Sequence, residues 1–136
     1  RASIAQGTAL LRIAAGTFDG LSSELKILQD FLKAPMAFHG HHATFFGYLC
    51  SKLGFDSKTT AQFAMYLYTR DILSAANRLS LIGPMQSSRI LYLFGSHIEK
   101  ICQTKTSDLN EVSQTDPLIE LLQGSHDKLY SRMFNS

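Results

Sequence analysis

The chain has 136 residues, of which 45% are hydrophobic and 18% are charged, and its formal net charge is +2. This length fits one domain with enough apolar residues for a core. The small charge and the absence of a basic run argue against nucleic-acid binding, and no apolar run approaches the ~20 residues of a membrane span. Cys50 and Cys102 lie within helix-like stretches, which favours two reduced thiols in an intracellular protein over a disulfide.

Apolar residues recur at helical spacing along most of the chain, and no stretch alternates as a strand would. The residue patterns predict helices over 2–15, 24–32, 42–53, 57–80, 84–103 and 117–124. Gly and Pro separate several of these ranges: Gly54 ends the third helix, Gly83-Pro84 separates the fourth from the fifth, and Gly124 ends the sixth. Residues 105–113 are polar and poor in apolar groups, so we expect a loop there.

The stretch from Ser57 to Ser80 is the longest of these predicted helices, with Ser57 as its expected N-cap. Its apolar residues cover most of its circumference, which is typical of a helix surrounded by others. They are Ala61, Phe63, Met65, Leu67, Tyr68, Ile72, Ala75, Ala76 and Leu79. We therefore predict an all-α protein, a single compact bundle of about five to six helices around this central buried helix.

Four segments together resemble a known family. The central one is R-D-I-L-S-A-A-N-R-L-S-L-I-G-P at 70–84, and the others are A-Q-G-T-A-L-L at 5–11, G-H-H-A-T-F-F-G at 40–47 and G-S-H-D-K-L-Y-S-R-M-F-N-S at 124–136. In their order along the chain, these segments resemble those of the urease accessory protein UreF in its eukaryotic, plant-like form. The resemblance covers nearly the whole chain.

The resemblance implies an all-α protein that dimerises and binds UreD (also called UreH), and through it the GTPase UreG and urease. It implies a cytoplasmic, non-enzymatic scaffold or GTPase-regulating chaperone for nickel insertion, without a cofactor. UreF chains are commonly longer at the N-terminus and this chain begins with Arg1. We therefore expect residues 1–136 to be the C-terminal part of a UreF-like helical domain, with 125–136 as a partner-binding or flexible tail.

Polar side chains near Gly83-Pro84 are the first candidates for binding a partner. Arg70, Ser74 and Asn77 recur at i, i+4 and i+7, which places them on one helical face. The tail adds aromatic and cationic groups of the kind that anchor interfaces. The candidate partner-binding residues are Arg70, Asn77, Arg78, Gln86, Arg89, Tyr130, Arg132 and Phe134. The alternatives are a buried polar network or solvated strip for the first group, and a frayed terminus or a flap over the domain's own core for the tail.

The cluster His39, His41 and His42 is the sharpest candidate for metal chemistry, since imidazole binds Ni and Zn. Adjacent residues on a helix point about 100° apart and no carboxylate or thiol lies nearby in sequence, so these are weak candidate ligands. They leave open an alternative function, a small helical His-rich nickel-binding protein. We predict no catalytic residues, because the chain has neither a G-x-S-x-G elbow nor a P-loop.

Overall fold

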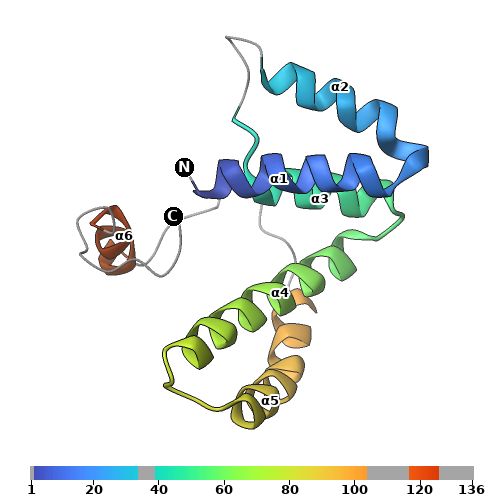
Figure 1. The fold of residues 1–136 in the computed structure, drawn as a ribbon. Coiled ribbons are helices and arrows are strands. Elements are labelled where there is room, and N and C mark those ends of the chain that lie inside the picture. Colours follow the sequence, from blue (N-terminus) through green and yellow to red (C-terminus); the bar gives the residue numbers. More distant parts are fainter. Residues whose placement is uncertain (1, 34–38, 104–116, 126–136) are drawn as a thin grey trace. The chain divides into compact units, whose positions relative to one another are not determined.

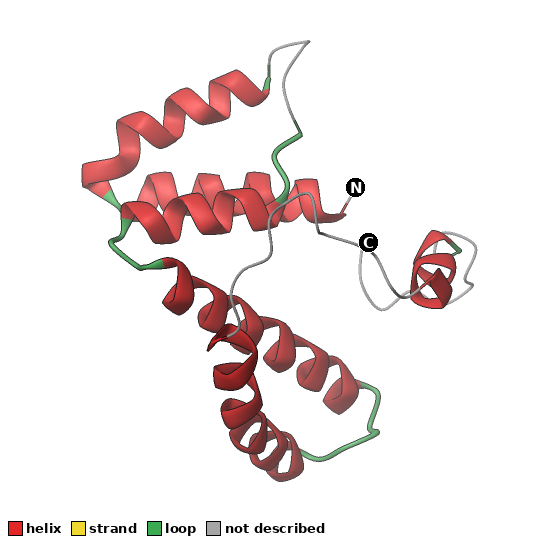
Figure 2. Cartoon of the chain, turned by 180° about the vertical axis from the view of Figure 1, so that it is seen from behind, coloured by secondary structure: helices red, strands yellow, loops and turns green. Residues whose placement is uncertain are grey.

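The computed structural model describes residues 2–33, 39–103 and 117–125 (Figure 1). Its elements are α1 (Ala2–Thr17), the short 3-10 helix η1 (Asp19–Leu21), α2 (Ser22–Leu32), α3 (His42–Lys52), α4 (Ser57–Arg78), α5 (Pro84–Gln103) and α6 (Pro117–Gly124). Figure 2 shows helices and loops but no strand in these ranges, so the predicted all-α class is confirmed. Every predicted helix is present, with ends that differ by at most two residues.

The chain divides into two compact units, one formed by residues 1–49 with 111–136 and the other by residues 50–110. Each unit is described by itself below. Within the described ranges, no helix combines the length and apolar character that crossing a membrane requires.

The first unit has its core where α1, α2 and α3 supply small and large apolar groups. Its buried members are Leu11, Ala14, Ala15, Leu25 and Phe45. Alanines on α1 allow α2 to pack closely against it, and Leu25 of α2 is 1% exposed. The Tyr48 hydroxyl of α3 donates a hydrogen bond to the Glu24 carboxylate of α2, which ties these two helices together.

A close backbone approach joins the beginning of α1 to the segment that leads into α3. Gly7 is buried, and a Cβ atom at this position would collide with the Gly40 carbonyl oxygen and lie 3.0 Å from the His42 backbone nitrogen. One turn earlier, the Ser3 hydroxyl accepts a hydrogen bond from the same His42 nitrogen at 3.2 Å. Only glycine fits at position 7 without displacing this backbone, so A-Q-G and G-H-H form one structural feature.

The second unit is a helical hairpin in which α4 packs against α5 (Figure 1). Asp56, rather than the predicted Ser57, is the N-cap of α4, and its carboxylate accepts a hydrogen bond from the Thr59 backbone nitrogen at 2.7 Å. Bonding to Thr59 lowers the pKa of the Asp56 carboxyl. At the other end Ser80 has a φ of +57°, the left-handed conformation that turns the chain toward Pro84.

The prediction that α4 is a buried central helix is wrong. None of its 22 residues is buried, and Tyr68 and Ile72 are 49% and 70% exposed. The physical reason is that α5 is the one described helix packed against it in this unit, and one neighbour covers only one stripe of a helix. Within its own unit, α4 is therefore a largely exposed helix rather than a central one.

Candidate functional site

A groove lies between α4 and α5, close to the turn that joins them. Its volume is about 260 Å³, and its lining residues are Arg70, Leu73, Ser74 and Asn77 from α4 with Pro84, Ser87, Ser88 and Leu91 from α5. Three of these, Arg70, Ser74 and Asn77, are the residues that the helical spacing places on one face. The structure thus brings them together on the same wall of one groove. Leu73, Ser88 and Leu91 were not among the predicted site residues.

Asn77 holds the turn beside this groove. With its amide oriented so that both polar atoms have partners, its nitrogen donates to the carbonyl oxygens of Ile82 at 2.8 Å and Gly83 at 3.3 Å. Its oxygen accepts a hydrogen bond from the Ser87 hydroxyl at 2.9 Å. Ser87 is only 9% exposed, so this is a polar network at the base of the groove. That geometry matches the buried-network alternative for Asn77.

Arg70 lies at the groove with its charge partly compensated. Its Nε and Nη2 atoms donate to one oxygen of the neighbouring Asp71 at 3.2 and 2.9 Å. Both side chains are more than half exposed, 54% for Arg70 and 65% for Asp71. Exposed ion pairs of this kind contribute about 0–1 kcal/mol to stability. The pair therefore does little for the fold and leaves Arg70 accessible to a binding partner.

The other predicted site residues of this hairpin, Arg78, Gln86 and Arg89, are exposed and do not line the groove. Their role in binding a partner stays a prediction. Tyr130, Arg132 and Phe134 lie outside the described residues, as does almost all of the predicted tail.

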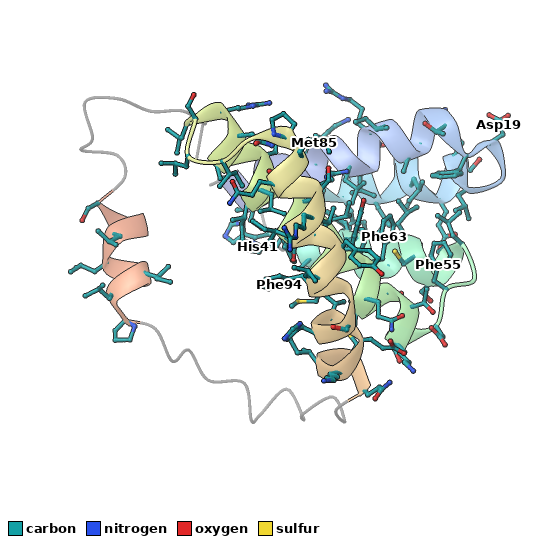
Figure 3. The ribbon with its side chains drawn as sticks, turned by 90° about the horizontal axis from the view of Figure 1, so that it is seen from below. Asp19, His41, Phe55, Phe63, Met85 and Phe94 are labelled. Atoms are coloured by element: carbon teal, nitrogen blue, oxygen red, sulfur yellow. The ribbon has the colours of Figure 1, made fainter. Side chains whose placement is uncertain are left out.

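The hairpin also exposes large apolar side chains. Ile72, Leu81, Met85 and Tyr92 are between 70% and 86% exposed. Met85 stands at the beginning of α5 and Phe94 lies further along the same helix (Figure 3). These side chains come from both helices of the hairpin and from the turn between them. Sequence periodicity could not reveal this surface, because it does not distinguish an apolar face that another helix covers from one that none covers.

The histidine cluster does not form a metal site in the described part of the chain. The His39 and His41 rings are perpendicular with centroids 6.3 Å apart, whereas the His42 ring stacks on Phe46 at 5.8 Å. His41 Nδ1 instead lies 3.3 Å from the Ser3 hydroxyl. Among the described residues, no three His, Cys, Asp or Glu side chains are grouped as metal ligands. The geometry therefore does not favour the nickel-binding alternative.

Both cysteines are free thiols, as predicted. Cys50 is 3% exposed, and burial raises the pKa of its thiol, although a hydrogen bond with Thr60 opposes the shift. A buried thiol with a raised pKa is a poor nucleophile, so Cys50 is a packing residue.

Comparisons with known proteins agree on one family. The sequence model of the UreF family matches residues 1–94. Urease accessory protein F of Oryza sativa subsp. indica is 41% identical over 135 residues, which cover 98% of this chain and 51% of the rice protein. The Arabidopsis thaliana protein of the same name is 37% identical over 137 residues, covering 100% of this chain and 57% of that one.

A bacterial relative extends the match beyond plants. Urease accessory protein UreF of Trichodesmium erythraeum is 30% identical over 130 residues, which cover 94% of this chain and 54% of that protein. The chain thus spans about half the length of these curated relatives. No solved structure matches.

Proposed function

The chain belongs to the UreF family of urease accessory proteins, and from this premise we propose that it acts in urease maturation as a non-enzymatic scaffold. The observation that carries the proposal is 41% identity to a plant urease accessory protein over 98% of the chain. In this role the chain supplies binding surfaces, and nickel is the cargo that is inserted into urease.

The proposed partners are UreD (UreH) and, through it, the GTPase UreG and urease, with the chain acting in the cytoplasm as a homodimer. Two features of the α4–α5 hairpin support a role in protein association. It exposes large apolar groups such as Met85 and Tyr92, and it carries exposed arginines at 70, 78 and 89. Aromatic residues and arginine are the side chains most enriched among the dominant contacts of interfaces. Regulation of the GTPase cycle of UreG is part of the same proposal.

The segment 125–136 is proposed as a second partner-binding element. It combines Tyr130, Arg132 and Phe134 within five residues, and a short segment with two aromatic rings and a guanidinium can anchor an interface.

The test is urease activation in cells that produce urease and the other accessory proteins but lack their own UreF. Expressing the chain should raise both urease activity and the nickel content of the purified urease. The matched control is the same chain without residues 125–136, which should restore less of both. Unchanged urease activity, with the chain shown to be folded and present at the level of the other accessory proteins, would contradict the proposal.

A further inference from the structure

Resting on that function, we propose that the groove between α4 and α5 receives an acidic side chain of a partner protein, whose carboxylate is held by Arg70. The occupant is a protruding Asp or Glu on the partner's surface. The proposal assigns Arg70 and Ser74 as polar contacts, and it assigns Leu73 and Leu91 as the apolar walls.

The shape and lining of the groove suit a short acidic side chain. A volume of about 260 Å³ is roughly nine times the ~30 Å³ that one water molecule occupies in the liquid, enough for a carboxylate with its methylene groups. Ser74 lies one turn from Arg70 on the same wall, so its hydroxyl can donate a second hydrogen bond to the carboxylate. The Ser88 hydroxyl already donates to the Pro84 carbonyl oxygen at 3.1 Å, so it serves as wall rather than as donor.

Arg70 can take a second carboxylate without a rearrangement of the helix. A guanidinium has five N–H groups, and the bonds to Asp71 use Nε and one N–H of Nη2. Charge–charge hydrogen bonds to a guanidinium are stronger than neutral ones, especially once the groove is closed off from water. Asp71 therefore competes mildly with the partner's carboxylate for Arg70. The proposal thus predicts that removing the Asp71 carboxylate strengthens binding.

The charge of the hairpin around the turn favours an acidic partner. Between positions 70 and 89 the chain has three arginines, Arg70, Arg78 and Arg89, and a single acidic residue, Asp71, for a net charge of +2. A positive surface steers an acidic partner toward the groove and disfavours a basic one.

The experiment measures the affinity of the chain for purified UreD from the same source, by calorimetry at two salt concentrations. Arg70→Gln should weaken binding by about 10-fold or more, since it removes a charged hydrogen bond. Asp71→Asn should strengthen binding several-fold, because it removes the competing carboxylate. Lys58→Gln is the matched control: it lies on α4, is exposed, removes one positive charge and does not line the groove. It should change the affinity by less than about 2-fold.

Equal effects of Arg70→Gln and Lys58→Gln would overturn the proposal, since only general charge would then matter. A loss on Asp71→Asn as large as that on Arg70→Gln would also overturn it, because the ion pair itself would then be the required feature. Unchanged melting temperatures of the variants exclude unfolding as the cause. A chain that binds UreD regardless of these substitutions contradicts the acidic anchor but leaves the proposed function standing, whereas a folded chain that does not bind UreD at all contradicts both.

A second measurement identifies the occupant directly. A photo-crosslinking amino acid at position 88, on the groove wall, should couple to a UreD peptide that contains Asp or Glu next to the coupled residue. The same amino acid at position 58 is the control and should give little product. Coupling of position 88 to a segment without a carboxylate would overturn the proposal.

Discussion

The side-chain amide of Asn77 in α4 accepts a hydrogen bond from the Ser87 hydroxyl in α5 at 2.9 Å, while its nitrogen donates to the Ile82 carbonyl oxygen at 2.8 Å. The Asn77 side chain thus links α4 to both the turn and α5, and it fixes the direction in which α5 leaves the turn. The groove beside this turn depends on that direction. Asn77 is therefore a positioning residue, whereas Arg70 on the same wall of the groove has an exposed side chain.

Replacing Asn77 by alanine should lower the stability of the fold. The change leaves the buried Ser87 hydroxyl and the turn carbonyls without this partner, and an unsatisfied buried polar group costs about 1–3 kcal/mol. Urea unfolding followed by circular dichroism should show a lower midpoint with an unchanged slope. Gln86→Ala is the control, because Gln86 is exposed at the same turn, and it should stay within about 0.5 kcal/mol of the original chain. Equal stability of both variants would show that Asn77 does not fix the turn.

Glycine-to-alanine substitutions in α1 should have opposite effects at two positions. At Gly7 the new Cβ meets the backbone of Gly40 and His42, which cannot move aside as a side-chain end does, so Gly7→Ala should destabilise the fold by about 1–3 kcal/mol. At Gly16 nothing lies within 4 Å, and Gly16→Ala should stabilise the helix by up to about 1 kcal/mol. Thermal unfolding of the two variants measures both. A tolerated Gly7→Ala would contradict the close approach of α1 to the segment before α3.

The N-cap of α4 should make stability depend on pH in the acid range. Bonding to Thr59 lowers the pKa of the Asp56 carboxyl in the folded chain, so its contribution is present above the unfolded value of about 4 and is lost as the pH falls through the folded pKa. Asp56→Asn keeps a capping oxygen that does not titrate. Between about pH 5 and pH 2 the melting temperature of the original chain should therefore fall further than that of the variant. Parallel curves would argue against this cap.

Cys50 should make stability depend on pH in the alkaline range. Burial raises the pKa of its thiol in the folded chain, so the unfolded chain ionises first, and stability is lost as the pH rises above the unfolded value of about 8.5. The difference in unfolding free energy between the original chain and Cys50→Ala should shrink from pH 7 to pH 10. Cys102, which is only half-buried, should also react faster with iodoacetamide than Cys50. A constant difference across this range would mean that Cys50 titrates normally.

The helices could be predicted from sequence because their signals are local. Gly54, Gly83-Pro84 and Gly124 lie next to the observed helix ends, and apolar spacing identified each helix. The N-cap was misplaced by one residue because Asp56 and Ser57 both have capping side chains, and only the backbone conformation shows which one accepts the bond from Thr59.

The burial of α4 could not be predicted, because it depends on how many neighbours the helix has. Apolar residues on most sides of α4 are compatible either with a central helix or with a helix whose exposed sides bind something outside its own unit. The groove could be predicted only in part: Arg70, Ser74 and Asn77 share a face of one helix, whereas Ser88 and Leu91 join them through the packing of α5. The joining of Gly7 to Gly40 is likewise a contact between distant segments.

The most direct test of membership in the urease maturation machinery is a pull-down of UreD from the same source by the purified chain, with and without residues 125–136. We expect UreD to be retained by the full chain and retained much less by the shortened one. Failure of a folded, monodisperse chain to retain UreD would contradict the scaffold function proposed here.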